Sequence, residues 1–379
     1  MQTLALLLLL GLLAPPSTSV TPATQSTAER QSGDAGSQVD TEAKRPKRVV
    51  DSLPISWTPT VPYGLPEDLF ERAPASDEVV ALGRSLFFDP ILSEDRSVSC
   101  SSCHDPKFGF ADPVANSIGI HGQATTRNAP TLLNRALGSS FFWDGRASSL
   151  EEQSLMPISN PTEMGTELAP ILARLAAQSS YAEGFRSALG GPPSGDHVGT
   201  ALAAFLRRLT HGNSAVDRFR KGEYGVLSDE ARAGMWIFES NGRCWKCHSG
   251  SNFSDEEFHN TGIGVREEQP EEGRFAISGI ASERGAFKTP TLRGLTMTAP
   301  YMHDGSMKTL TEIVEFYREG GHPNAHLDEE MKVLEIDDRG ARSLVAFLEA
   351  LSDTAPSSSA GDGEDPYGDE DEGGAASGD

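Results

Sequence analysis

The chain has 379 residues, of which 37% are hydrophobic and 23% are charged, and this balance excludes disorder as a description of the whole chain. Lysine and arginine number 32 against 55 aspartates and glutamates, so the formal net charge is −23. Because that charge would repel a nucleic-acid backbone, we expect no nucleic-acid partner.

The two ends of the chain differ in composition from its middle. Leu4 to Ala14 is an uninterrupted apolar run, which is typical of a secretory signal peptide and too short to span a bilayer. We therefore predict a signal peptide at residues 1–22, export to the periplasm, and a flexible linker at residues 23–60. An uncleaved apolar anchor is the alternative. Residues 354–379 are rich in Ser, Gly, Asp and Glu and are expected to form a disordered acidic tail.

Between these ends the recurring pattern is helical, and strand patterns are scarce. Ser76 is expected to cap a helix whose apolar side includes Val79, Leu82 and Leu86, and another apolar stripe begins at Val198.

Three further helix starts are predicted from capping residues. Ser148 to Glu151 and Thr309 to Glu312 both match the capping-box pattern, in which the first and fourth side chains hydrogen-bond each other's backbone. Ser228 is expected to begin the helix that precedes Cys244.

All four cysteines of the chain fall into two identical patterns. In Cys-x-x-Cys-His, the two thiols can reach the two vinyl groups of one haem, and the histidine is placed to bind its iron. The residues predicted to attach and ligate two haems are Cys100, Cys103 and His104, and then Cys244, Cys247 and His248. A zinc site made from both cysteine pairs and a thiol redox motif are the alternatives, and a zinc site would not explain a histidine after each pair.

These patterns together predict the architecture. We expect a mainly α fold with two cytochrome c-like helical domains, each binding one covalently attached haem. The first domain is placed at residues 61–220 and the second at residues 221–353, because polar stretches separate the helical patterns near residues 212–227.

Several longer motifs accompany the two haem patterns. They are Leu86-Phe87-Phe88-Asp89-Pro90, Arg127-Asn128-Ala129-Pro130-Thr131, Phe142-Trp143-Asp144-Gly145-Arg146, Phe258-His259-Asn260-Thr261-Gly262, Phe287-Lys288-Thr289-Pro290-Thr291-Leu292-Arg293 and Pro300-Tyr301-Met302-His303-Asp304-Gly305. In these motifs and in their order, the chain resembles the bacterial dihaem cytochrome c peroxidase family, which includes the MauG-like enzymes. The resemblance covers about residues 75–350.

The resemblance implies roles for residues around the first haem. His104 would be the proximal ligand of the peroxidatic haem, and His248 that of the electron-transferring haem. Gln153 and Glu163 have the spacing of the family's distal-pocket pair, and a carboxylate there can move a proton between the two oxygens of peroxide. Trp143 matches the family's tryptophan between the haems, where an indole can relay electrons, although core packing is its ordinary role.

The resemblance also implies a calcium ion at the junction of the two domains. Its ligands would be Asn128 and the backbone carbonyls of Thr298 and Pro300, because this hard cation prefers oxygen. A turn asparagine and a rigid proline loop are the structural alternative.

The lid over the first haem departs from the family pattern. Aligned without gaps, Ile120 takes the position of the distal histidine that closes the resting site in peroxide-scavenging members, and His121 follows one residue later. With Ile120 facing the iron, the site would stay open, as in MauG-like enzymes; a one-residue loop shift would make His121 the ligand.

The sixth ligand of the second haem departs as well. Tyr317 stands where scavenging peroxidases have methionine, within a Phe-Tyr-x-x-Gly-Gly sequence similar to that of the ligating tyrosine in MauG-like enzymes. Helical periodicity also turns Tyr317 inward. Met302 and Met307 are the rival ligands.

These observations predict a periplasmic dihaem c-type peroxidase that reduces hydrogen peroxide with electrons from a protein donor, a small cytochrome c or a cupredoxin, or that oxidises a partner protein as MauG does. A second copy of the chain is a further candidate partner. The alternatives are a scavenging cytochrome c peroxidase and a dihaem electron-transfer cytochrome without turnover.

Overall fold

The structure is a computed structural model, and it describes residues 60–266 and 269–353. These residues all belong to the compact unit formed by residues 49–379. The predicted signal peptide, the linker up to residue 59 and the acidic tail at residues 354–379 lie outside the described residues. Within the described part, no helix is long and apolar enough to cross a membrane.

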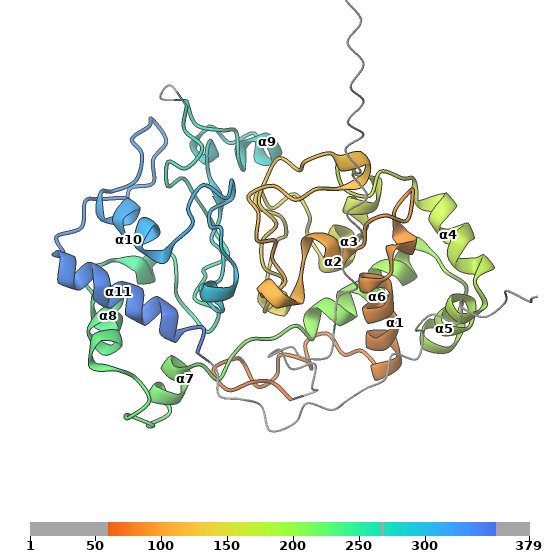
Figure 1. Ribbon diagram of the computed structural model, residues 1–379, viewed down its shortest axis with the longest axis horizontal. Helices are drawn as coiled ribbons and strands as arrows, with labels where there is room; N and C mark the ends of the chain where they lie inside the picture. Colours follow the sequence, from red (N-terminus) through yellow and green to blue (C-terminus); the bar gives the residue numbers. More distant parts are fainter. Residues whose placement is uncertain (1–59, 267–268, 354–379) are drawn as a thin grey trace, which may run out of the picture. The chain divides into compact units, whose positions relative to one another are not determined.

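The described chain is mainly helical, which confirms the predicted fold class. In Figure 1, α1, α3, α4, α5 and α6 form one group, drawn in orange to green. The elements of this first half are α1 (Asp77–Phe88), η1 (Pro90–Leu92), α2 (Cys100–Cys103), η2 (Pro106–Phe108), η3 (Ile120–Gly122), η4 (Arg135–Leu137), α3 (Leu150–Ser159), α4 (Leu168–Ala177), α5 (Ser179–Leu189) and α6 (Gly195–Arg207).

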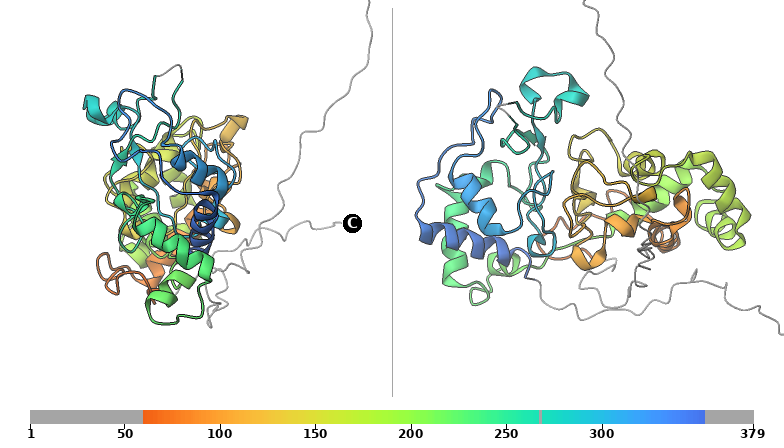
Figure 2. Two further views of the ribbon diagram at one scale, coloured as in Figure 1. Left: turned by 90° about the vertical axis from the view of Figure 1, so that its left-hand side faces the viewer. Right: turned by 45° about the horizontal axis from the view of Figure 1, so that its top comes forward.

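The second half forms another group, in which α8, α10 and α11 lie together, and the two groups stand apart again in the right-hand view of Figure 2. Its elements are α7 (Ala215–Arg220), α8 (Asp229–Glu239), η5 (Cys244–Lys246), β1 (Phe258–His259), α9 (Phe275–Ser278), η6 (Ala281–Glu283), β2 (Phe287–Lys288), η7 (Leu295–Met297), α10 (Leu310–Arg318) and α11 (Asp338–Ala350). The two short strands pair antiparallel, with Phe258 opposite Lys288.

Each half has its own hydrophobic core, and the two cores are built alike. In the first, Phe87 of α1 packs on Phe205 of α6 with ring centroids 5.2 Å apart. In the second, Phe238 of α8 packs on Phe347 of α11 at 4.9 Å. Burial of these rings, together with the aliphatic side chains around them, stabilises each half. The predicted boundary at residue 220 stays a prediction.

A glycine lets the two main helices of each half approach closely. A Cβ atom on Gly83 of α1 would lie 1.8 Å from the carbonyl oxygen of Ala201 in α6. A Cβ atom on Gly234 of α8 would lie 1.8 Å from the carbonyl oxygen of Ser343 in α11. Only glycine tolerates this backbone approach, so both halves use the same device to hold a helix pair together.

The predicted helix starts are confirmed at three places and shifted at one. Ser76, Ser228 and Thr309 are the N-caps of α1, α8 and α10, and Thr309 forms the predicted capping box. The cap of α3 is Ser149 instead of Ser148, since its hydroxyl accepts a hydrogen bond from the N–H of Glu152.

The reason for this shift is that Glu151 is engaged elsewhere. Its two carboxylate oxygens accept hydrogen bonds from Arg207 of α6 at 2.7 and 2.9 Å. Glu152, not Glu151, provides the carboxylate that accepts a backbone hydrogen bond at the start of α3: its Oε2 accepts the N–H of Ser148 at 2.8 Å.

Candidate active site

A cavity of about 620 Å³ is lined by residues of both halves. The sequence-predicted site residues that line it are Cys103, His104, Asn128, Trp143, Gln153, Glu163, Cys244, Cys247, His248, Thr298, Pro300 and Tyr317. Of the other predicted residues, Cys100 packs against the first core, and His121 is not part of the lining. The fold therefore brings nearly all predicted site residues into one space.

Each Cys-x-x-Cys-His sequence forms a single tight turn that ends in its histidine. The first turn is α2, with His104 at its C-cap, and the second is η5, with Cys247 at its C-cap. All four cysteines are free. Among the described residues, the only cluster spaced to hold a metal ion is Cys247, Asp255 and His259, so the two cysteine pairs do not meet in one zinc site.

Both histidines have one ring nitrogen held by a backbone carbonyl and the other left free. The Nδ1 of His104 lies 3.0 Å from the carbonyl oxygen of Phe110, and the Nδ1 of His248 lies 2.9 Å from that of Phe253. A carbonyl can only accept, so Nδ1 carries the proton and Nε2 keeps its lone pair. Burial lowers the pKa of both histidines, which keeps them neutral. Neutral imidazoles with a free Nε2, next to paired thiols, fit a covalently attached haem.

The residues expected above the first haem come from α3 and the loop after it. Gln153 lies in the second turn of α3, and Glu163 follows the end of that helix. The side-chain amide of Asn160 donates a hydrogen bond of 2.7 Å to Glu163 Oε1. Burial raises the pKa of Glu163, although the Arg146 charge and the Asn160 hydrogen bond oppose the rise. A raised pKa makes this carboxyl group a better proton acceptor than a solvated glutamate.

Tyr317 is presented to the other end of the cavity by α10. The capping box at Thr309 starts this helix, and the helix buries Leu310 and Val314 on its apolar side. Burial raises the pKa of the Tyr317 phenol above its ordinary value. Met302 also lines the cavity, whereas Met307 does not.

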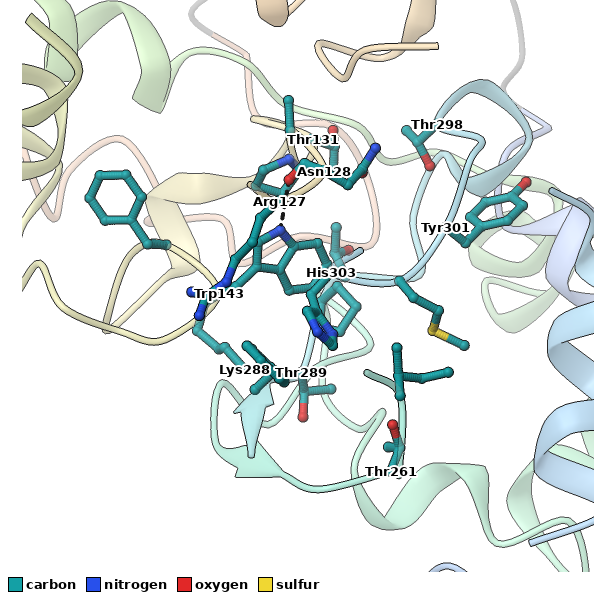
Figure 3. A pocket seen from close by; sticks show the side chains of 18 of the residues that line it. Arg127, Asn128, Thr131, Trp143, Thr261, Lys288, Thr289, Thr298, Tyr301 and His303 are labelled. Carbon is teal, nitrogen blue, oxygen red and sulfur yellow. Dashed lines mark hydrogen bonds between the residues drawn. The ribbon is translucent and has the colours of Figure 1, made fainter. Parts of the chain in front are cut away.

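Trp143 lies where the two halves meet, and its backbone and ring are both held (Figure 3). Its indole N–H donates to the carbonyl oxygen of Asn128 at 2.9 Å, drawn as the dashed line. Its own carbonyl accepts the N–H of Lys288 at 2.8 Å, and the N–H of Asn128 donates to the carbonyl of His303 at 2.8 Å. The rings of Trp143 and His303 meet edge-on at 6.4 Å. Trp143 is thus in contact with both halves.

The lid loop separates Ile120 from His121. Ile120 is buried, and its N–H donates to the carbonyl oxygen of Glu163 at 2.9 Å. His121 has a left-handed φ of 56° and points outward, where its Nε2 lies 3.4 Å from a carboxylate oxygen of Glu94. Its side chain is 57% exposed, so it lies at the surface of the structure.

Several polar residues of the cavity wall were not predicted. His259 lies between two carboxylates, with Nδ1 2.7 Å from Asp328 and Nε2 3.0 Å from Asp255. The hydrogen bonds of Asp255, Cys247 and Asp328 raise the pKa of His259 to about 11, so it is cationic. His259 lies in the Phe-His-Asn motif that the sequence singled out. Its partner Asp328 is 69 residues further along the chain, so no local pattern indicated the pair.

Three further charged residues were also missed by sequence reasoning. Arg135, Glu256 and Lys288 form a buried cluster where the halves meet, and Arg135 and Lys288 line the cavity. Only Lys288 lay in a motif that the sequence singled out.

A family model described as di-haem cytochrome c peroxidase matches residues 77–225. The methylamine utilization protein MauG of Methylorubrum extorquens is 41% identical over 280 residues, which cover 73% of this chain and 79% of that protein. The cytochrome c551 peroxidase of Nitrosomonas europaea is 33% identical and covers 75% of this chain and 82% of that protein. The chain therefore belongs to the di-haem cytochrome c peroxidase family and carries two c-type haems.

A solved structure agrees with this assignment. A MauG-like protein associated with microbial copper homeostasis has a TM-score of 0.70 and 31% sequence identity to this chain. The match covers 79% of this chain and 94% of that one. The arrangement of the two helical halves is thus shared with a MauG-like protein.

Proposed function

We propose that the protein is a periplasmic peroxidase that reduces hydrogen peroxide at the His104 side of the cavity. The observation that carries this proposal is the placement of Glu163 and Gln153 in the same cavity as His104, with Asn160 orienting the carboxyl group. When bound, the haems supply iron that binds peroxide and accepts and passes electrons.

Glu163 is the proton carrier in this proposal. Peroxide must lose a proton from one oxygen and gain one on the oxygen that leaves, and a single carboxyl group can perform both transfers. Its raised pKa suits this task, because a strongly acidic group would accept a proton poorly. Gln153, from α3, has only an amide to offer and serves to orient the oxygens by hydrogen bonding.

Trp143 is the electron relay in this proposal. Its side chain contacts a residue of each half, and both its N–H and its carbonyl are hydrogen-bonded. Because these hydrogen bonds hold the indole in place, the distances over which an electron would pass between the two ends of the cavity stay the same.

The two ends of the cavity are proposed to differ in their sixth ligand. Tyr317 is the proposed sixth ligand on the His248 side, supported by its place on the cavity wall beside His248 and Cys247. On the His104 side we propose an open position, because Ile120 has no ligating atom and His121 points toward Glu94.

A calcium ion is proposed at the junction, held by Asn128 and by the carbonyls of Thr298 and Pro300. All three residues line the cavity, and Asn128 is buried. The Asn128 amide nitrogen donates to the carbonyl of Val114 at 3.1 Å, which leaves its oxygen for a cation.

The electron source is proposed to be a small donor protein, or the side chain of a partner protein. One relative is named cytochrome c551 peroxidase, which supports a small cytochrome as the donor, and another is named methylamine utilization protein MauG. Electron transfer without turnover is the alternative function, because two haems alone permit it.

The test is the variant Glu163→Gln, prepared with both haems attached. Removing the proton carrier is expected to lower the peroxidase kcat/KM by about 10²–10⁴-fold. Glu167→Gln is the matched control, because Glu167 is exposed and only four residues away. Peroxidase activity is measured with a chemical electron donor, and reduction by dithionite is recorded for each variant.

The electron-carrier alternative makes the opposite prediction. A carrier would show no peroxidase rate in the unmodified protein, or equal rates in Glu163→Gln and Glu167→Gln, with unchanged reduction in both variants. Either result would reject Glu163 as the proton carrier.

A further inference from the structure

Three charged side chains form a compact cluster where the two halves meet. Arg135 of η4 donates two hydrogen bonds to Glu256, at 2.9 Å to Oε1 and 2.8 Å to Oε2. Lys288 of β2 donates to the same Oε2 at 3.3 Å. Arg135 belongs to the first half, and Glu256 and Lys288 belong to the second.

The cluster holds one more cation than anions, although it is buried. The side chains of Arg135 and Lys288 are each 9% exposed, and that of Glu256 is 10% exposed. A buried charge is costly unless an opposite charge or several hydrogen bonds compensate it. Burial and the Arg135 charge accordingly lower the pKa of Lys288 to about 8. One carboxylate does not compensate two cations.

The uncompensated charge faces the cavity. Arg135 and Lys288 both line the cavity, whereas Glu256 does not belong to the lining. Lys288 has three N–H groups, of which one is used by Glu256, so two remain for a ligand. Figure 3 shows Lys288 beside Trp143, to which its backbone is hydrogen-bonded.

Glu256, the carboxylate of this cluster, has an unusual backbone conformation. Its φ is 60°, in the left-handed region that non-glycine residues rarely adopt. Its N–H donates to the hydroxyl of Ser254 at 3.0 Å, which fixes the turn. Such strain is typically retained where a side chain has a function to perform.

We propose that Arg135 and Lys288 together bind a carboxylate group of a haem, and that Glu256 limits the charge they present to it. The carboxylates are the only anionic groups at the edge of a haem, whereas hydrogen peroxide is uncharged near neutral pH. The proposal rests on haem attachment and does not depend on peroxidase activity. According to this proposal, the charges of Arg135, Lys288 and Glu256 help to set the reduction potential of that haem.

The electrostatic consequence has a definite sign. A nearby cation stabilises the reduced iron, which carries one positive charge less than the oxidised iron, and so raises the potential. Removing the Lys288 charge is expected to lower the midpoint potential of the haem concerned. Removing the Glu256 charge is expected to raise it.

The experiment is a redox titration of the purified protein with both haems attached, followed by visible absorbance and without peroxide. The variants are Lys288→Met, Lys288→Arg and Glu256→Gln. The control is Lys308→Met, which removes the same charge from an exposed position of the second half. Haem content per chain is measured for each variant.

We expect a lower midpoint potential in Lys288→Met, a higher one in Glu256→Gln, and the unmodified value in Lys288→Arg and Lys308→Met. The proposal is overturned when Lys288→Met and Glu256→Gln shift the potential in the same direction or leave it at the value of the Lys308→Met control. If Lys288→Met fails to fold, Glu256→Gln alone decides: a raised potential supports the proposal, and an unchanged one rejects it.

Discussion

Pro157 and Tyr317 occupy matching positions in the two halves. Pro157 follows Trp143 by the same 14 residues that separate Tyr317 from His303, and both lie near the end of their helix, α3 or α10. Both also line the cavity. Proline has no ligating side-chain atom, whereas tyrosine has a phenol oxygen. Together with Ile120 and the outward-facing His121, this difference fits the proposed contrast between an open first site and a ligated second site.

The variant Tyr317→Phe tests the proposed ligand. We expect the oxidised protein to show one high-spin and one low-spin haem by low-temperature electron paramagnetic resonance, and Tyr317→Phe to convert the low-spin signal to high-spin. Tyr301→Phe is the control, because the Tyr301 hydroxyl is already used by the carbonyl of Leu295 at 2.9 Å. An unchanged low-spin signal in Tyr317→Phe would point to a methionine such as Met302.

At the scale of elements, the same helix pair is built twice. α1 packs on α6 and α8 packs on α11, each across a glycine that contacts the opposing backbone. The turns α2 and η5, which carry the two Cys-x-x-Cys-His sequences, follow α1 and α8 in the chain, so each helix pair supports one turn. Displacing a helix would therefore move a haem-attaching turn.

Gly83→Ala tests this packing. The added methyl would require α1 and α6 to separate, which is expected to lower the free energy of unfolding by about 1–3 kcal/mol despite alanine's better helix propensity. Gly225→Ala is the control, because a Cβ atom there meets nothing within 4 Å. The measurement is chemical denaturation. Equal unfolding free energies for the two variants would contradict the argument that the close approach of α1 and α6 requires glycine at position 83.

At the scale of the whole described chain, a buried ion pair links segments distant in sequence. Arg293 lies in the motif after β2, and both its terminal nitrogens donate to Asp217 of α7, at 2.7 and 2.9 Å. Arg293 also donates to the carbonyl oxygen of Gly64 at 3.2 Å. The two side chains are 1% and 4% exposed. The pair therefore joins the start of the described chain to the second half.

Asp217→Asn is expected to lower the free energy of unfolding by about 3–5 kcal/mol, because Arg293 would keep a buried charge without its partner. Burial opposes ionisation of Asp217, but Arg293 outweighs it and lowers the pKa below the ordinary 3.8. The stabilisation is thus complete at neutral pH and is lost as the pH falls below that value.

Denaturation at pH 7 and at pH 3 measures both effects. Asp229→Asn is the control, since the Asp229 side chain is 91% exposed and its pair with Arg232 contributes little. A loss for Asp217→Asn no larger than that of the control would contradict the argument.

The sequence by itself predicted the two haem-attachment motifs, and it determined the helical class and the main helix starts. These features depend on local chemistry: two thiols and an imidazole at fixed spacing, or a hydroxyl that accepts a hydrogen bond from an N–H three residues later. The cap of α3 was missed by one residue because a contact from α6, Arg207, engages Glu151.

Only the tertiary structure decided which residues surround the cavity and which way they face. Ile120 and His121 are neighbours in sequence, yet one is buried and the other exposed, because the backbone of the lid loop is fixed by the carbonyl of Glu163. Arg135 and Glu256 are 121 residues apart, and no local pattern pairs them. Whether one buried charge compensates another depends on the distance between them in space. The spacing of two residues in the sequence does not give that distance, because folding of the two halves sets it.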